Sequence, residues 1–353
     1  MVKIAVAGNL YLDAYLKGDV IEHDDFVILS SIGLEAKIHI LDPPINQGFK
    51  HETGIDIEKR IRGMNYELLP GGGGFNTVYS IRKLNGAMDL SYIDVSSPEP
   101  IATKELEDSN IDHLFLDLRR PTTNIILCSE YDRTILKGCK FPTGEFEYGH
   151  EEDIREKIQG ADAIAINSIR DESFAETLLR HSSNIPKYIM ITKSLPQDFV
   201  RERMLQHGNI FFSCEDFAAF NNYNPLELGK EDFSELSLQN MQKMVSDRIV
   251  PRGKLFFITL GSNGVLCADN DGIIYNIRLE DKYRAELNNS ARQNPKSTNG
   301  AGDFFAGAAI ISDIGRASAI DTAIYASIAA TRHIGYQGHM KKSYFIIKPC
   351  KHS

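Results

Sequence analysis

The chain has 353 residues, of which 42% are hydrophobic and 25% are charged. This is the composition of an ordinary globular protein with a well-buried core, and the length suits one large α/β domain or two smaller ones. The formal net charge is −9 and no cluster of five or more Lys and Arg occurs, which argues against duplex nucleic acid as a partner. A nucleotide ligand is not excluded, because backbone amides can bind a phosphate locally.

The cysteines, the first residues and the apolar segments indicate the cellular compartment and whether the protein spans a membrane. No CxxC or His/Cys spacing links the five cysteines, Cys128, Cys139, Cys214, Cys267 and Cys350, which argues against a disulfide framework and a zinc site. The first residues, MVKIAVAGN, lack a signal-peptide layout. The apolar run 306–311 is far below the roughly 20 residues that a bilayer crossing needs. We therefore expect a cytoplasmic protein that does not span a membrane.

The first elements are a buried strand and an unusual β-rich insertion. Ile4–Ala7 is a short apolar run followed by Gly8 and Asn9, which is typical of a central parallel strand. Residues 15–69 hold alternating segments at 26–29 and 37–41, broken by Asp42-Pro43-Pro44. This pattern predicts a small, exposed β-element rather than core.

A helix and a hairpin follow. Apolar residues at Val78, Ile81 and Leu84 predict a helix after Gly74 that ends near residues 85–86. Residues 123–128 and 134–137, separated by Tyr131-Asp132-Arg133, predict a β-hairpin.

The remainder of the chain alternates strands with helices. Strands are predicted at 163–166, 188–192, 210–212 and 255–260, and two closing helices at 303–314 and 317–334. Such alternation predicts βαβ units, and therefore a mostly parallel, doubly wound α/β sheet with helices on both faces.

The segment Ser297–Asp303, with the sequence STNGAGD, is the strongest candidate for chemistry. Gly300 and Gly302 allow a tight turn with several N–H groups on one side, and the helix that follows adds the positive end of its dipole. Together they would form an anion cradle that suits phosphate, beside which Asp303 could accept a proton from an attacking hydroxyl. The alternative is an ordinary glycine-rich turn in which Asp303 caps a buried helix.

Two further segments lie at predicted strand or helix ends. The run Pro70–Asn76, with four consecutive glycines, precedes a helix but fits neither the GxGxxG nor the GxxxxGK[ST] template. It indicates a close backbone approach or a positive φ, with a flexible hinge as the alternative. Asp13 follows the first strand, where ligands bind in open α/β sheets, although it could equally be a helix cap or a solvated loop acid.

Taken in order, these segments resemble the ribokinase family of PfkB-type sugar and nucleoside kinases. The resemblance rests on an Asp after the first strand, a G-G-x-G-x-N run before a helix, and a late T-N-G-A-G-D that opens a helix. Thr259–Gly264 resembles the family's T-L-G-x-x-G loop on the nucleotide side. Residues 326–335 resemble its last helix, which borders the adenine.

Carried over residue by residue, the resemblance implies an ATP-dependent kinase acting on a hydroxyl. Asp303 would be the base, and the anion hole would consist of Gly300, Ala301 and Gly302. The substrate would contact Asn9, Asp13, Gly72 and Asn76, and the nucleotide would lie near Gly261 and Gly264. A small β-lid on the α/β core would exclude water during transfer.

The resemblance also implies domain limits and a metal. The kinase core would comprise residues 1–14, 70–110 and 138–353, and the lid residues 15–69 and 111–137. Mg²⁺ would be held through water by Asp216, because Ser213–Asp216 is a weaker match to the family's N-x-x-E motif. Ser297 also stands where the family usually has Asp, and the span from Asp13 to Gly71 is longer than usual.

The sequence leaves two alternative functions and a possible homodimer undecided. The T-N-G-A-G-D motif also resembles that of adenosine kinases, so the acceptor could be a nucleoside rather than a sugar. A non-catalytic protein that binds a sugar or nucleotide on the same fold is the third possibility. Exposed strand edges between Tyr15 and Leu69 would allow a homodimer through the lid.

Overall fold

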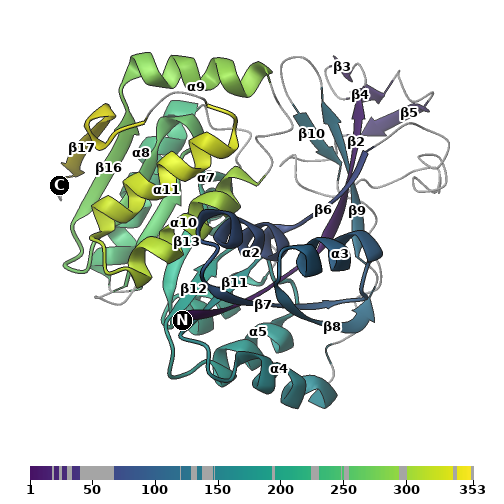
Figure 1. Ribbon diagram of the computed structural model, residues 1–353. Helices are drawn as coiled ribbons and strands as arrows, with labels where there is room; N and C mark the ends of the chain where they lie inside the picture. Colours follow the sequence, from purple (N-terminus) through teal and green to yellow (C-terminus); the bar gives the residue numbers. More distant parts are fainter. Residues whose placement is uncertain are drawn as a thin grey trace.

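The structure is a computed structural model of the chain (Figure 1). It describes the residues 1–17, 20–23, 26–29, 34–39, 67–119, 121–128, 133–136, 146, 148–192, 195–223, 230–247, 249, 254–293, 300–336 and 340–350. The predicted break at Asp42-Pro43-Pro44 and the first three residues of the late motif, Ser297–Asn299, lie outside this set.

A mixed sheet forms the centre of the molecule. Within the described ranges it has ten strands, in the spatial order β17 (Phe345–Cys350), β16 (Ile274–Leu279), β15 (Val265–Ala268), β14 (Phe256–Thr259), β13 (Asn209–Ser213), β12 (Lys187–Met190), β11 (Ala163–Asn167), β1 (Lys3–Gly8), β7 (Asp89–Ser96) and β8 (Asp112–Arg119). The strands from β14 to β8 pair in parallel, and β15, β16 and β17 add an antiparallel edge. The predicted mostly parallel sheet is confirmed.

Each face of this sheet buries its own apolar core. Along β1, Ile4 and Val6 belong to one core, whereas Ala5 and Ala7 belong to the other. This split follows from the geometry of a strand, in which successive side chains point to opposite faces. A strand buried on both faces is therefore apolar throughout, as the sequence of β1 predicts.

Helices cover both faces, as expected for a doubly wound fold (Figure 1). The first core includes residues of α2 (Gly73–Leu84), α3 (Pro100–Asp108), α9 (Asp281–Gln293), α10 (Ala301–Ile314) and α11 (Ala319–His333). The second includes residues of α4 (Glu151–Ile158), α5 (Glu172–His181), α7 (Cys214–Phe220) and α8 (Lys230–Ser246), and the short α6 (Gln197–Phe199) lies between α5 and α7 in the chain. No helix in the described part of the chain is long and apolar enough to cross a membrane.

Two small sheets stand apart from the main sheet, in the region where the lid was expected (Figure 1). One has the order β10 (Arg133–Leu136), β9 (Thr122–Cys128), β2 (Tyr11–Lys17) and β6 (Glu67–Gly71). The other contains β3 (Val20–His23), β4 (Phe26–Leu29) and β5 (Leu34–His39). The antiparallel pairing of β9 with β10 confirms the predicted hairpin.

The border between core and lid differs from the expected one at two places. Strand β8, residues 112–119, pairs in parallel with β7 at the edge of the main sheet, although 111–137 was expected to be lid as a whole. The reason is that α3 connects β7 to β8 as an ordinary parallel crossover, and Leu116 is buried in the second core. Strand β2 already begins at Tyr11, so the lid also starts earlier than residue 15.

The strand order reverses at β1, which fixes where a ligand would bind. From β1 the chain first builds the sheet outward through β7 and β8, and then returns to the other side of β1 with β11. In open α/β sheets, ligands bind beyond the carboxyl ends of the strands at such a switch point. The carboxyl ends of β1, β7 and β11 are therefore the first place to look for a site.

Candidate active site

Asp303 lies in the first turn of α10, behind a glycine in a left-handed conformation. Gly300 is the residue that precedes the helix, with φ 79°, and its carbonyl accepts a hydrogen bond from the Phe304 N–H at 2.8 Å. A Cβ added at Gly302 would have no neighbour within 4 Å among the described residues outside its own helix, so this part of the turn is open toward them. Asp303 is thus the acid in the first turn of a 14-residue helix, whose first amides form the positive end of the helix dipole.

Both carboxylate oxygens of Asp303 accept hydrogen bonds from other elements. The Nδ2 of Asn76, on α2, donates to Oδ2 at 3.1 Å, and the Nδ2 of Asn167, at the end of β11, donates to Oδ1 at 2.9 Å. Two donors, one on each oxygen, fix the orientation of the carboxylate. Asp303 is therefore part of a site that joins three elements, and the cap position of α10 is occupied by Gly300 instead.

Asn167 was not identified from the sequence. Its Nδ2 also donates to Thr77 Oγ1 at 2.9 Å, and its Oδ1 accepts from Ser168 Oγ at 2.8 Å, so the whole amide is fixed. Its position in the sequence could have identified it, because Asn167 is the polar residue directly after the apolar run Ala163–Ile166. Asn9 follows the apolar run of β1 in a similar way.

The second glycine run brings α2 against the end of β1. A Cβ added at Gly74 would lie 2.5 Å from the Cα of Gly8, and one added at Gly72, whose φ is 97°, would overlap the carbonyl oxygen of Asn9. Backbone packs directly on backbone here, which only glycine allows. The expected close approach is confirmed, and the alternative of a flexible hinge is wrong for this run. The same contact positions Asn76 one turn into α2.

Asn9 and Asp13 are both buried at the carboxyl end of β1 and the start of β2, with exposed fractions of 2% and 4%. The amide of Asn9 donates to the carbonyl of Ser168 and accepts from the guanidinium of Arg119. Asp13 Oδ1 accepts from Asn124 Nδ2 at 2.9 Å. Asp13 is thus a buried strand residue, and it is neither a helix cap nor a solvated loop acid.

A buried carboxylate that the sequence analysis missed supports this loop. Asp94 lies two residues before the end of β7 with no exposed surface, and it accepts from the Leu10 N–H, from the Ser96 N–H at 2.8 Å and from the Tyr92 hydroxyl at 2.7 Å. Burial raises the pKa of Asp94, although these donors partly oppose the rise. The sequence feature that could have identified Asp94 is its place as the single acid in the otherwise mostly apolar strand sequence YIDVS.

The predicted nucleotide side lies at the same edge of the sheet. Gly261 and Gly264 form the tight turn between β14 and β15, with φ values of 59° and 103°, and Leu260 N donates to Gly264 O at 2.8 Å. Because β14 runs parallel to β1, this turn is at the edge that also carries Asn9. A Cβ added at Gly261 would have no neighbour within 4 Å in the described part of the chain, so the turn is open toward these residues.

Asp216 lies at the start of α7, in a capping box. Ser213 is the cap residue, and its hydroxyl accepts from the Asp216 N–H at 3.0 Å and donates to Asp216 Oδ2 at 2.7 Å. Such a pair stabilises the beginning of a helix. Among the described residues, no group of three or more His, Cys, Asp and Glu side chains could hold a metal ion. A role of Asp216 toward Mg²⁺ therefore stays a prediction.

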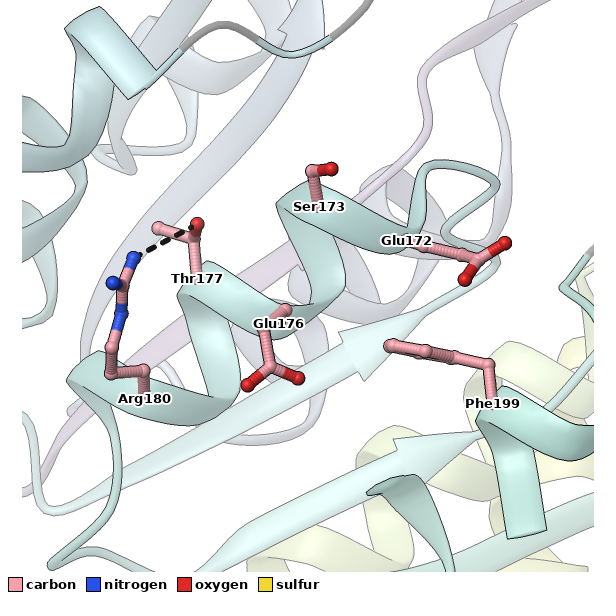
Figure 2. A pocket seen from close by; sticks show the side chains of 6 residues that line it. All are labelled: Glu172, Ser173, Glu176, Thr177, Arg180 and Phe199. Carbon is pink, nitrogen blue, oxygen red and sulfur yellow. Dashed lines mark hydrogen bonds between the residues drawn. The ribbon is translucent and has the colours of Figure 1, made fainter. Parts of the chain in front are cut away.

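A shallow pocket elsewhere on the surface contains none of these residues. Figure 2 shows it along α5, where the lining side chains are Glu172, Ser173, Glu176, Thr177, Arg180 and Phe199. Two of its charged groups form ion pairs, Arg180 with Glu151 at 2.7 Å and Glu176 with Arg203. This pocket therefore does not coincide with the candidate site, which is defined by the strand ends and the polar contacts between them.

Comparison with known proteins shows the fold. No protein-family model and no curated protein sequence matches the chain. The structure of ribokinase from Giardia lamblia is similar with a TM-score of 0.63, 13% identity, and coverage of 96% of this chain and 94% of that chain. A ribokinase from Cryptococcus neoformans var. grubii serotype A in complex with ADP is similar with a TM-score of 0.59 and 13% identity, and the match covers 96% of this chain and 95% of that chain.

A nucleoside kinase from Methanocaldococcus jannaschii, described as an archaeal member of the ribokinase family, gives a TM-score of 0.57 at 13% identity, with coverage of 96% and 93%. These neighbours confirm over nearly the whole chain that the fold is ribokinase-like, as the sequence motifs imply.

Proposed function

We propose that this protein transfers the γ-phosphoryl group of ATP to a hydroxyl of a small molecule, with Asp303 as the base. The observation that carries the proposal is the Asp303 carboxylate, which two amide donors hold beside the open first turn of α10. The fold, which is that of sugar and nucleoside kinases, supports the same activity. The nucleotide in one of these neighbours is ADP, which is the product expected from ATP.

The chemistry follows from the arrangement around Asp303. The acceptor oxygen attacks the γ-phosphorus as its proton passes to Asp303, and the bond from phosphorus to the bridging oxygen of ADP breaks. Charge on the transferring group is spread over its oxygens, so the amides of Gly300, Ala301 and Gly302 and the helix dipole would stabilise it. Asn76 and Asn167 hold the carboxylate in its orientation until the acceptor arrives.

The remaining residues divide into an acceptor side and a nucleotide side. Asp13, Asn9, Gly72 and Asn76 surround the start of the lid and would contact the hydroxyl-bearing acceptor. The open turn at 261–264 would lie along the nucleotide. Mg²⁺, when bound, would neutralise charge on the phosphates, and the phosphates and water would supply most of its oxygen ligands, with Asp216 reaching it through water.

The test is an ATP-consumption assay over a panel of sugars, sugar phosphates, sugar acids and nucleosides, followed by Asp303→Asn on the best acceptor. We expect kcat to fall about 10²- to 10⁴-fold, the usual contribution of a general base, while ADP still raises the unfolding temperature. The matched control is Asp321→Asn, which removes a carboxylate from the first turn of α11, and it should keep full activity. Activity of Asp303→Asn within threefold of the wild type would remove Asp303 from the mechanism. No turnover with any compound, together with retained ADP binding, would favour the non-catalytic alternative.

A further inference from the structure

Two arginines gather around Tyr11 on the acceptor side of the candidate site. The guanidinium of Arg170 lies over the ring of Tyr11, 5.1 Å from its centre, and that of Arg119 donates to Asn9, two residues before Tyr11. Burial raises the pKa of Tyr11, and the charges of both arginines oppose that rise. We call Arg119 and Arg170 the arginine pair.

No carboxylate forms an ion pair with either member within the residues that the structure describes. Both side chains are nevertheless only partly exposed. Other partly exposed arginines are satisfied internally: Arg284 pairs with Asp281 at 3.0 Å, and Arg82 donates to three backbone carbonyls. The nearby acid, Asp94, is occupied by the Leu10 and Ser96 amides and the Tyr92 hydroxyl. Among the described residues, no ion pair therefore occupies the arginine pair, in a protein with a net charge of −9, and its positive charge is available to a ligand.

A continuous chain of hydrogen bonds links the arginine pair to the proposed base. Arg119 donates to Asn9, Asn9 donates to the Ser168 carbonyl, the Ser168 hydroxyl donates to Asn167, and Asn167 donates to Asp303. Arg170 follows Ser168 by two residues. One acceptor molecule could thus present its hydroxyl to Asp303 and another group to the arginines.

The neighbouring β7 offers a further polar group. Ser96 faces Arg119 in the register of β7 and β8, and its exposed fraction is 2%. Its hydroxyl has no hydrogen-bond partner among the described residues. A buried hydroxyl without a partner costs free energy, and a bound ligand oxygen would remove that cost.

We propose that the arginine pair binds an anionic group of the acceptor, so that the substrate is a hydroxyl compound carrying a phosphate or a carboxylate. Guanidinium groups suit both, because their planar N–H donors match the oxygens of either anion. The proposal rests on the proposed function, and it replaces neutral sugars and nucleosides by phosphorylated or acidic compounds as the expected acceptor class.

The first test compares matched probes on the wild-type protein by calorimetry and ATP consumption. Fructose 6-phosphate and fructose form one pair, and gluconate and glucose form the other, which separates phosphate from carboxylate. We expect the anionic member of at least one pair to bind at least 10-fold more tightly, with an affinity that falls as salt is added. Turnover of the neutral compounds alone would overturn the subsite and leave the kinase proposal intact.

The second test uses Arg119→Gln and Arg170→Gln, with Arg155→Gln on α4 as the matched control, because the Arg155 side chain is exposed and pairs with Glu152 on the same helix. Each of the first two should weaken the anionic probe about 10- to 100-fold, the effect of one or two charge-assisted hydrogen bonds, and should leave ADP binding unchanged.

The outcomes of the variants separate the subsite from the reaction. Loss of anion binding in a protein that shows no ATP turnover would support the subsite and contradict the kinase. Equal binding of the anionic probe by all four proteins would overturn the subsite. If the variants failed to bind ADP as well, the arginines would be structural, and the wild-type comparison of matched probes would then decide the acceptor class by itself.

Discussion

The two sides of the candidate site are built in different ways. On the acceptor side, the contacts join residues far apart in the chain: Leu10 with Asp94, Asn76 with Asp303, and Asn167 with Asp303. On the nucleotide side, the contacts are local, from Ser213 to Asp216 and from Leu260 to Gly264. The acceptor side is also tightly packed, whereas the glycines at 261 and 302 border open space.

This difference separates two kinds of sequence information. A local turn needs only a few suitable residues in a row, so a short motif identifies it. A buried polar network needs partners that the whole sheet brings together, and each partner lost leaves another buried group unsatisfied. Substitutions on the acceptor side should therefore affect stability and activity together, while those on the nucleotide side should affect ligand binding more than the fold.

The largest effect on stability is expected for Gly74→Ala. The new Cβ would lie 2.5 Å from the Cα of Gly8, and neither backbone can move without displacing α2 or β1. We expect the free energy of unfolding to fall by roughly 3 kcal/mol or more, because the overlap is with backbone rather than with a flexible side chain. Gly302→Ala is the control, since its Cβ would have no neighbour within 4 Å. Urea unfolding of both proteins measures the effect, and similar midpoints would contradict the tight packing on the acceptor side.

A smaller loss of stability is expected for Asp94→Asn. The Leu10 and Ser96 amides donate to different oxygens of Asp94, so an asparagine must turn its NH₂ group toward one of these N–H donors. We expect a destabilisation of about 1–3 kcal/mol at pH 5, the cost of one buried unsatisfied donor. Asp89→Asn, at the exposed start of the same strand, should change the free energy of unfolding by less than about 0.5 kcal/mol. An equal change in the free energy of unfolding for the two substitutions would mean that the buried hydrogen bonds of Asp94 do not stabilise the fold.

The same variant gives a dependence on pH. Because the folded pKa of Asp94 is raised, the folded protein keeps a proton on Asp94 at pH values where the unfolded chain has lost it. Above the ordinary Asp value of about 3.9, the free energy of unfolding that Asp94 contributes therefore falls as the pH rises toward the folded pKa. The difference in stability between wild type and Asp94→Asn should decrease from acid toward neutral pH. A difference that grows over this window would show that the pKa is lowered instead.

The smallest effect on the fold is expected for Asp216→Ala on the nucleotide side. Ser213 still caps α7 in this variant, so the loss should be about 0.3–1 kcal/mol, the usual scale for an acid near a helix N-terminus. If Asp216 acts on Mg²⁺ through water, the rate at saturating ATP should need a higher free Mg²⁺ concentration than in the wild type. Identical Mg²⁺ curves would assign Asp216 to the capping box alone.

The sequence predicted the parts of the molecule that depend on short patterns. The order of strands and helices, the β-hairpin, the small sheets and the position of Asp303 all follow from periodicity, glycines and motif order. Asn167 and Asp94 could not be ranked in this way, because a single polar residue in an apolar strand says nothing about its partners. The core position of residues 112–119 was missed for a related reason, since the strand alone does not tell which sheet it joins.

The long separations within the acceptor-side network also bear on how the protein folds. The two residues of the Asn167–Asp303 contact are 136 positions apart in the chain, and those of the Asn76–Asp303 contact are 227 positions apart. Each contact closes a large loop, and the chain must lose the conformational entropy of that loop before the contact is gained. Asp303 meets Asn76 and Asn167 only when α2, β11 and α10 are all in place. Activity should therefore appear late during refolding, after the helices have formed, and a nascent chain should remain inactive until its last 60 or so residues have docked on the sheet.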